Sequence, residues 1–397
     1  MADGRRRWLI LAIGTLTQAA TCSFIYGIPM LVPALRSDDH LTLFGASLVV
    51  SAPMVGVLLT LIAWGALADR RGERLVIAAG TGAAAALLTA AAAVGGPVSL
   101  GALLVAAGAA GASVNAASGR VVMGWFPLHE RGLAMGTRQT AQPLGVAIAA
   151  LALPPLAHDH GARVALLFPA LLCGVAALSV LVFVVDPPRP QVPAGVAPAP
   201  SPYRGSRHLA RIHLASSALV VPQFAISAFT LVYLVGQRHW DPAAAGRMIF
   251  AFQLAGAFGR IVSGVWSDRV RSRLLPMRQL AVTSAALMAL LALASALHAW
   301  WIVAVFAVSA VITVADNGLA YVAVAETAGA AWSGRALGVQ NTVQNLASVA
   351  TAPLLAAIIG NTRYALGFAL VAVFPVLAVP LTPVRAEAEQ QLIPSLP

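Results

Sequence analysis

Three arginines lie inside strongly apolar stretches of this chain. Arg120, Arg138 and Arg260 each stand seven or eight residues from the polar loop that borders their stretch. If the stretches are helices, a rise of about 1.5 Å per residue places all three side chains roughly 10 to 12 Å from those loops. A planar guanidinium group binds carboxylates and similar oxyanions through two parallel hydrogen bonds. Three such groups at one depth therefore predict an anion site.

The composition indicates what surrounds these stretches. Hydrophobic residues make up 59% of the 397 residues and charged residues only 10%, whereas soluble domains are about half apolar and about a quarter charged. A helix needs about 20 apolar residues to cross a bilayer. The sequence has twelve such runs, at 8–35, 43–68, 75–96, 98–126, 132–157, 164–185, 211–236, 244–267, 279–298, 300–327, 336–360 and 362–384. We therefore predict an all-α membrane protein with twelve transmembrane helices.

The distribution of basic residues predicts the orientation of the chain. All 25 basic residues are arginine; the connections on the side of the N-terminus hold 17 of them, and those on the other side hold four. The positive-inside rule therefore places both termini in the cytoplasm and predicts a multi-pass protein of the cytoplasmic membrane. It also accounts for the net charge of +11 without a nucleic acid partner.

The two halves of the chain resemble each other. The sequence GALAD at 65–69 recurs as GVWSD at 264–268, and GTRQTAQPL at 136–144 recurs as GVQNTVQNL at 338–346. The proline-rich segment between the halves is typical of a linker. We predict a six-helix half at 1–185, a cytoplasmic linker at 186–210, a second six-helix half at 211–384 related to the first by pseudo-two-fold symmetry, and a cytoplasmic tail at 385–397.

Charge is concentrated in the sequence GALADRRGER, residues 65–74. Gly65 permits close helix packing and Gly72 a tight bend, while Asp69 could bind the N-terminus of a neighbouring helix or a nearby arginine. We call the contact that these loops would form the latch. Its predicted residues, taken from both repeats, are Gly65, Asp69, Arg70, Gly72, Arg74, Asp268 and Arg269. The alternative is a short basic loop that only sets the topology.

The twelve runs, the repeat, the central linker and this loop together resemble the major facilitator superfamily of secondary transporters, over essentially the whole chain. The family loop has the pattern G-x-x-x-D-R-x-G-x-R, which the first copy matches throughout, whereas the second copy has Arg271 in place of the second glycine. The resemblance implies transport by alternating access. It also implies that the latch holds the two halves together on the cytoplasmic side while the cavity opens outward.

A narrower resemblance surrounds Arg260. The sequence GRIVSGVWSD is similar to the eighth span of nitrate/nitrite porters and of monocarboxylate and oxalate carriers, in which an arginine contacts the anion. Nitrate porters also have an arginine in span two, where this chain has Leu61, so nitrate itself is disfavoured. The stretch 125–145 looks like the cyanate and nitrate-like porters grouped with organic-anion carriers. These similarities imply a small organic or inorganic anion as the substrate.

Each arginine also has a structural alternative. Arg120 could be the partner of Asp69 in the latch. Arg138 could pair with Glu130 or extend to the membrane surface, and Arg260 could serve packing alone. Depth along a helix does not decide between these roles.

Asp316 is the one acid deep in a predicted span. A charge near the bilayer centre costs roughly 2.5 to 3.5 kcal/mol and is seldom kept without a use. We expect Asp316 to couple transport to protons or to form an ion pair, and a helix–helix hydrogen bond is the alternative. Glu326 lies nearer the cytoplasmic end and is expected to join the latch.

Amide side chains occupy matching places in spans five and eleven. As substrate ligands beside the arginines we select Gln139, Gln142, Asn341 and Gln344. Hydrogen bonding between helices is the commoner use of such residues in membranes and stays the alternative.

Enzymatic activity, a metal site and a cofactor are not predicted. The eight histidines lie mostly singly near predicted helix ends, and no glycine-rich phosphate loop precedes a helix. We predict a proton-coupled symporter for a small anion, acting as a monomer in the lipid bilayer. A drug/proton antiporter is the first alternative, although the span-five sequence TAQPLGVAIAA keeps only part of the pattern of that group. A nutrient sensor that does not transport is the second.

Overall fold

The computed structural model describes residues 2–187, 200–204, 206–360 and 363–387. Within them, 12 helical segments are long and apolar enough to cross a membrane, so the prediction of an all-α protein with twelve transmembrane helices is confirmed. The segments are Gly4–Asp38, Gly45–Arg71, Glu73–Ala93, Pro97–Trp125, Leu128–His160, Ala162–Phe183, His208–Arg238, Ala244–Val270, Leu274–Ala296, Ile302–Ala328, Ser333–Ile359 and Tyr364–Glu387. Residues 188–199 and 205 of the predicted linker and 388–397 of the predicted tail lie outside the described residues.

The chain divides into two compact units. Unit 1 comprises Met1–Phe126, Thr140–Ala199 and Gly329–Thr342, and unit 2 comprises Pro127–Gln139, Pro200–Ala328 and Val343–Pro397. Each unit therefore combines most of one predicted half with a short segment from the other. The division of the sequence into halves at 186–210 stays a prediction.

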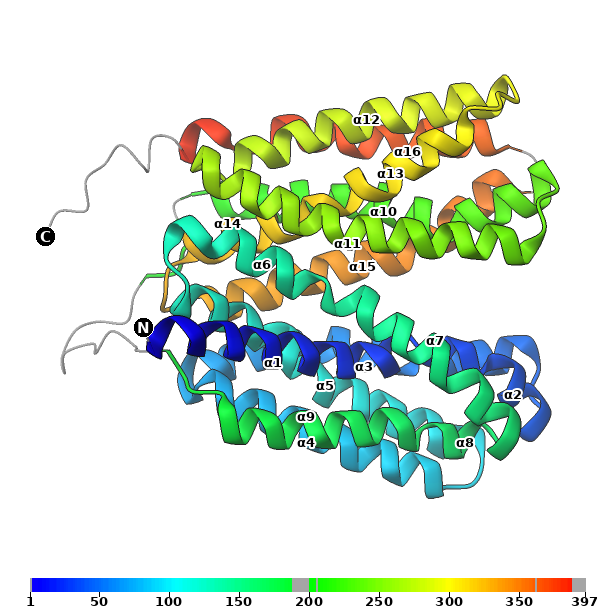
Figure 1. Ribbon diagram of the computed structural model, residues 1–397, viewed down its shortest axis with the longest axis horizontal. Helices are drawn as coiled ribbons and strands as arrows, with labels where there is room; N and C mark the ends of the chain where they lie inside the picture. Colours follow the sequence, from blue (N-terminus) through cyan, green and yellow to red (C-terminus); the bar gives the residue numbers. More distant parts are fainter. Residues whose placement is uncertain (1, 188–199, 205, 361–362, 388–397) are drawn as a thin grey trace, which may run out of the picture. The chain divides into compact units, whose positions relative to one another are not determined.

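Unit 1 is a bundle of apolar helices (Figure 1). It contains α1 (Ala2–Ile25), η1 (Ile28–Leu31), α2 (Val32–Asp38), α3 (Leu43–Arg71), α4 (Glu73–Ala93), α5 (Pro97–Trp125), α7 (Ala141–His160), α8 (Ala162–Ala165), α9 (Leu167–Phe183) and the first residues of α15 (Ser333–Ile359). Helix α5 packs against α3 and α4, and α4 packs against α9.

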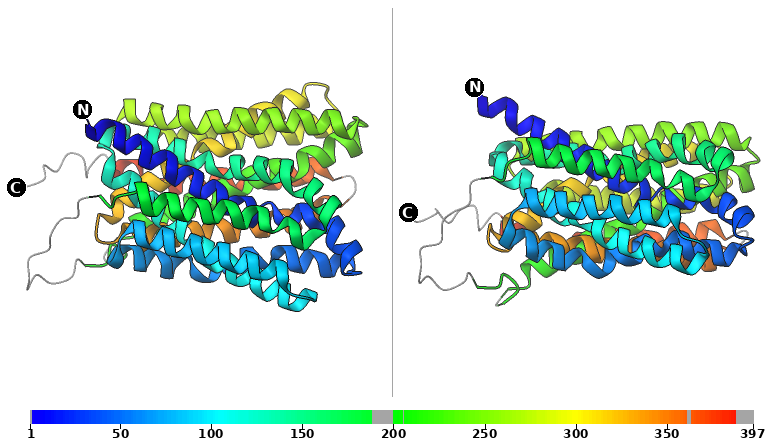
Figure 2. Two further views of the ribbon diagram at one scale, coloured as in Figure 1. Left: turned by 60° about the horizontal axis from the view of Figure 1, so that its bottom comes forward. Right: turned by 90° about the horizontal axis from the view of Figure 1, so that it is seen from below.

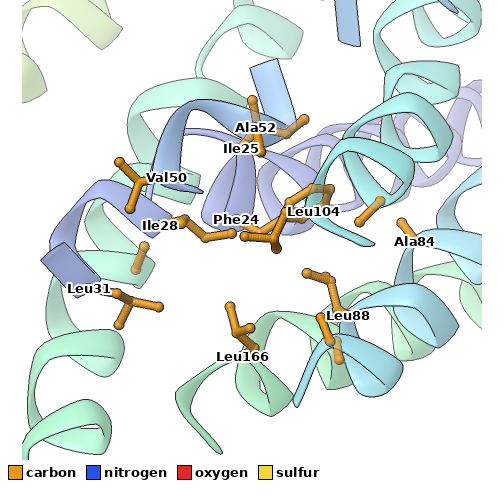
Figure 3. Packing of buried hydrophobic residues seen from close by; sticks show 14 of the residues in the cluster. Phe24, Ile25, Ile28, Leu31, Val50, Ala52, Ala84, Leu88, Leu104 and Leu166 are labelled. Atoms are coloured by element: carbon orange, nitrogen blue, oxygen red, sulfur yellow. The ribbon is translucent and has the colours of Figure 1, made fainter. Parts of the chain in front are cut away.

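Small residues bring the helices of unit 1 together. Gly56 of α3 faces the backbone of Val105 in α5, and Gly108 of α5 faces the backbone of Pro53 in α3. Lipid is as apolar as a protein core, so close van der Waals packing of this kind is what holds membrane helices together. Larger apolar side chains fill the rest of the interior, as Phe24 and its neighbours show in Figure 3.

Unit 2 contains the remaining helices. These are η2 (Leu128–Glu130), α6 (Arg131–Gln139), α10 (His208–Arg238), α11 (Pro242–Val270), α12 (Leu274–Ala296), α13 (Ile302–Ala315), α14 (Asn317–Ala328), the rest of α15, and α16 (Tyr364–Leu381). Helix α11 packs against α6 and α13, and α14 packs against α6 and α10. Within each unit the long helices run alongside one another in both views of Figure 2.

Four of the predicted spans are interrupted. The first is divided into α1, η1 and α2, and the sixth has Leu166 between α8 and α9. The fifth span consists of α6 and α7, with Thr140 between them, and the tenth consists of α13 and α14, with Asp316 between them. Interrupted helices are a known way for transporters to present backbone groups at a binding site. The interruptions of the fifth and tenth spans fall at or beside residues that the sequence selects as site candidates.

Candidate functional site

Arg138 and Arg260 meet at Gln139 in unit 2. Arg260 Nη1 donates a hydrogen bond of 2.5 Å to the backbone oxygen of Gln139, and Arg138 Nη1 donates one of 3.0 Å to its side-chain Oε1. Arg138 is only 2% exposed and Arg260 only 6%. Two positive charges are thus held close together in a buried place, where Coulomb interactions are stronger than in water.

Glycines allow α6 to come this close to its neighbours. Gly136 lies against the backbone of Arg260 in α11, with no room for a side chain. Across the other interface, Gly318 of α14 lies near the backbone of Gly136. The short α6 is therefore packed between α11 and α14, and this packing positions Arg138 and Gln139.

Asp316 lies close to Arg260. It is 2% exposed and stands at the junction of α13 and α14. The positive charge of Arg260 acts on its carboxylate. Among the described residues, no hydrogen-bond donor contacts Asp316 Oδ2. The structure therefore brings Arg138 and Arg260 together at Gln139 and places Asp316 within electrostatic range of Arg260.

Tyr321 is a member of this cluster that sequence reasoning missed. The guanidinium carbon of Arg138 lies 5.6 Å from the centre of the Tyr321 ring, within range of a cation–π interaction. Tyr321 is 5% exposed and lies five residues after Asp316 in the tenth span. A tyrosine inside an apolar span, close to the deep acid, was the available signal.

The structure gives the other predicted amide ligands contacts of their own. Gln344 of unit 2 donates to Ser216 Oγ at 2.7 Å. Asn341 belongs to unit 1, where it donates to the backbone oxygens of Leu337 at 2.9 Å and Asn115 at 3.3 Å. Both therefore make the hydrogen bonds between or within helices that formed the alternative interpretation. Gln142 is half-buried in α7 of unit 1.

Arg120 is surrounded by carboxylates in unit 1. It forms ion pairs with Asp69 and, at 2.7 Å, with Glu73. Glu73 has no exposed surface and is the acid that sequence reasoning did not select. A guanidinium group between two acids has its charge already balanced. Arg120 thus takes the alternative role, as the partner of Asp69, and we do not retain it as a substrate ligand.

Asp69 binds the first turn of α15 within unit 1. Its carboxylate accepts hydrogen bonds from the backbone N–H groups of Gly334 at 2.9 Å and Arg335 at 3.1 Å, and from Arg335 Nε at 3.0 Å. An anion is stabilised at a helix N-terminus, where N–H groups lack partners and the dipole is positive. One turn earlier, Gly65 lies against the backbone of Gly334.

Asp268 makes the equivalent contact within unit 2. It accepts hydrogen bonds from the backbone N–H groups of Gly132 at 2.9 Å and Leu133 at 2.8 Å, in the first turn of α6. Arg273 Nη1 donates to it at 2.6 Å. Gly264 lies against the backbone of Gly132, as Gly65 lies against that of Gly334. The two copies of the repeated sequence therefore make the same kind of contact, in which an aspartate binds the first turn of a helix.

Glu326 joins the second of these contacts. It pairs with Arg131 at 3.3 Å and with Arg273 at 3.5 Å. The sequence predicted that Glu326 would join the latch, because it lies near the cytoplasmic end of the tenth span.

The remaining predicted latch residues have other positions. Gly72 connects α3 to α4 with a φ of 102°, a conformation that favours glycine. The backbone N–H of Arg74 donates to Asp186 at 2.7 Å, and its side chain donates to the backbone oxygen of Leu181. Arg70 and Arg269 are exposed. Within the part of the chain that the structure describes, no three His, Cys, Asp or Glu side chains are placed to hold a metal ion.

Comparison with known proteins gives a family. The model of the Major Facilitator Superfamily matches residues 11–352. Two uncharacterized MFS-type transporters of Mycobacterium tuberculosis, from strains CDC 1551 / Oshkosh and ATCC 25618 / H37Rv, are each 44% identical over 380 residues, which is 96% of this chain and 85% of theirs.

Solved structures share the fold. The crystal structure of the human organic anion transporter MFSD10 (TETRAN) has a TM-score of 0.68 at 17% identity, covering 95% of this chain and 99% of the other. That of the E. coli fucose:proton symporter FucP (N162A) has a TM-score of 0.72 at 16% identity, with the same coverage. From the family match and the close relatives, the chain belongs to the major facilitator superfamily and is a transporter rather than an enzyme.

Proposed function

We propose that this transporter is a symporter that moves a small anion together with protons across the cytoplasmic membrane. The observation that carries the proposal is the meeting of Arg138 and Arg260 at Gln139, next to Asp316. Both guanidinium groups are positively charged and buried, so an incoming anion would be attracted to them. Guanidinium groups offer such an anion paired, charge-assisted hydrogen bonds.

The fold neighbours are compatible with this substrate class. MFSD10 is described as an organic anion transporter and FucP as a proton symporter. Their sequences are only 17% and 16% identical to this chain, and so the argument rests on the arginines and not on the neighbours.

Asp316 is the proposed proton carrier. An anion at Arg260 brings negative charge beside Asp316, and a proton on Asp316 removes negative charge from the same place. Each of these two ligands therefore favours the binding of the other, and such coupling is reciprocal by thermodynamic necessity. Anion and proton would move together, as in a symporter.

The two aspartate contacts are the proposed latch. Asp69 and Asp268 each hold the first turn of a helix, α15 and α6, and α6 ends at Gln139 in the proposed site. Contacts made in one conformation and lost in another set the populations of the two conformations. With the termini in the cytoplasm, as the arginine distribution indicates, both contacts would close the cytoplasmic side. Alternating access would then require both to open.

Direct binding tests the proposal. The purified protein is titrated with small carboxylates and inorganic oxyanions, and with lipophilic cations, and affinity is measured by calorimetry. Arg260→Gln should weaken binding of the best anion roughly 10- to 100-fold, because it removes a charge-assisted hydrogen bond. The anion affinity of Arg260→Lys should lie between those of the wild type and Arg260→Gln, because lysine keeps the positive charge but lacks the planar guanidinium group.

A matched control lies on the same helix. Arg247 is exposed near the start of α11, about 140° around the helix from Arg260. Arg247→Gln removes the same charge and should leave anion affinity unchanged. Equal affinity of the wild type and Arg260→Gln, or binding of lipophilic cations instead of anions, would contradict the proposal and favour a drug transporter.

A further inference from the structure

A polar face of α11 extends from Arg260 toward the beginning of the helix. Gln253 lies seven residues before Arg260, which places the two only about 20° apart around the helix and about 10 Å apart along it. Gln253 is exposed. The exposed apolar side chains of α11 point elsewhere and form a stripe, with Phe250 and Leu254 each 58% exposed and Phe258 67% exposed. Gln253 therefore belongs to the face of Arg260 and not to the apolar stripe.

Helix α10 has a matching face. Gln223, Ser227 and Thr230 follow one another at helical spacings of four and three residues, so they share one side of α10. The exposed apolar residues Leu214, at 58%, and Val232, at 49%, lie about half a turn away from Gln223. Ser227 is exposed on the polar side.

The two polar faces meet in a cavity inside unit 2. Its polar lining residues are Gln223, Ser227 and Thr230 of α10, Gln253 of α11 and Thr313 of α13, and apolar side chains of the same three helices, such as Ile226, Phe252 and Val314, complete the wall. The cavity has a volume of about 20 Å³, and about 10 to 15 Å³ is enough for one water-sized group. No charged residue is among those that line it.

The cavity adjoins the arginine cluster. Gln223 Oε1 accepts a hydrogen bond of 3.0 Å from Asn317, the residue after Asp316. Helical side chains lean toward the N-terminus of their helix, so Arg260 leans toward the part of α11 that carries Gln253. A ligand whose charged end sits at Arg260 would extend its other end toward this cavity.

The chemistry of the lining indicates what that other end is. An exposed amide in a membrane span is costly toward lipid, and such groups ordinarily face a partner or a water-filled path. Amide and hydroxyl groups donate and accept hydrogen bonds, as a substrate hydroxyl also does. A second anionic group would find no cation among the lining residues, and an alkyl group could not form a hydrogen bond with Ser227 or Gln253.

We propose that this cavity is a subsite for a hydroxyl group of the substrate, and that the transported anion is a short hydroxylated carboxylate. The inference rests on the proposed function, since Arg260 must hold the carboxylate. Gln223, Ser227 and Gln253 are its specificity-determining residues. A plain inorganic anion or an apolar acid would occupy only the arginine end of the site.

Four probes of similar size test the subsite. The purified full chain is titrated with propionate, lactate and glycerate, which carry zero, one and two hydroxyl groups on the same three-carbon acid, and with uncharged glycerol. Each well-placed hydroxyl should tighten binding roughly three- to tenfold over propionate. Glycerol, without a carboxylate, should bind weakly.

Variants of the lining residues test whether these residues cause the preference for glycerate over propionate. Gln253→Leu and Ser227→Ala should reduce glycerate affinity to that of propionate and leave propionate affinity unchanged. Gln279→Leu makes the same change at an exposed position of α12 outside the cavity, and it should keep the preference for glycerate. A melting temperature close to that of the wild type shows that each variant is folded.

The outcomes separate the two proposals. Equal binding of propionate and glycerate, lost in Arg260→Gln, would overturn the hydroxyl subsite and support the anion transporter. A glycerate preference that survives in both Gln253→Leu and Ser227→Ala would also overturn the subsite. Failure of every carboxylate to bind would overturn the proposed function and the subsite with it.

Discussion

Arg260 donates its hydrogen bond to the backbone oxygen of Gln139, the last residue of α6. The final carbonyl groups of a helix have no partner inside the helix and carry partial negative charge. Arg260 thus supplies the missing donor at the place where the fifth span is interrupted. An anion bound by Arg260 would compete with this carbonyl group and loosen the contact between α11 and α6. The Arg260 side chain would then couple substrate binding to movement of α6 relative to α11.

Tyr321 is expected to position the guanidinium group of Arg138. Tyr321→Leu removes the aromatic face and should weaken anion binding roughly three- to tenfold, the usual range for a cation–π contact. Tyr321→Phe keeps the face and should bind as the wild type does. Calorimetry on both variants with the best anion checks this. If phenylalanine and leucine weaken binding equally, the ring face has no such role.

Asp69→Asn should slow transport by shifting the conformational equilibrium. The substitution removes the charge that Arg120 and Arg335 both bind, while the amide oxygen still accepts one backbone hydrogen bond. We expect uptake into proteoliposomes to fall about tenfold or more. A contact that forms in only one conformation stabilises that conformation, and its loss changes the populations of the two conformations. Asp159→Asn, at an exposed residue of α7 that pairs with His158, serves as the control. Wild-type uptake kinetics in Asp69→Asn would remove this residue from the mechanism.

Two glycines of α11 allow a matched test of the close helix contact. At Gly264 an added methyl group would collide with the backbone of Gly132, whereas at Gly246 it would meet nothing within 4 Å. Gly246→Ala should be neutral or stabilise the protein by about 0.4 to 1 kcal/mol through the unfolded state. Gly264→Ala should lower the melting temperature and the uptake rate. Equal behaviour of the two variants would mean that α6 and α11 do not need this close approach.

Asp316→Asn should separate anion binding from proton coupling. Asparagine is uncharged like the protonated acid, so the anion should still bind and still exchange across the membrane. Accumulation driven by a pH gradient should be lost, because no proton can be released. Exchange and gradient-driven uptake of the same anion are measured in parallel. Retention of gradient-driven accumulation in the variant would assign the proton to another group.

The elements of the fold were accessible from the sequence because the bilayer imposes a length and an apolar composition on each span. The twelve spans and the repeated aspartate loops follow from those constraints. The positions of the breaks at Thr140 and Asp316 were not predicted, although poor helix formers lie at both. Pro143 has no N–H for the Gln139 carbonyl group, and Asp316 is followed by Asn317 and Gly318.

The site was only partly predictable for a different reason. Helical rise gives the depth of Arg120, Arg138 and Arg260 but not the direction of their side chains around each helix. Rotation is set by packing, which takes Arg120 to Asp69 and the unforeseen Glu73. It turns Arg138 and Arg260 toward the same glutamine. Tyr321 was missed because its role depends on the Arg138 position, which spacing along the sequence does not contain.

Uptake by the reconstituted protein tests the central claim most directly. Proteoliposomes containing wild type, Arg260→Gln or Arg247→Gln receive the best-binding anion with the proton gradient directed inward. The account predicts anion accumulation with alkalinisation of the outer medium for the wild type and Arg247→Gln, and neither signal for Arg260→Gln. Accumulation by Arg260→Gln at the wild-type rate, or transport of lipophilic cations in place of the anion, would contradict it.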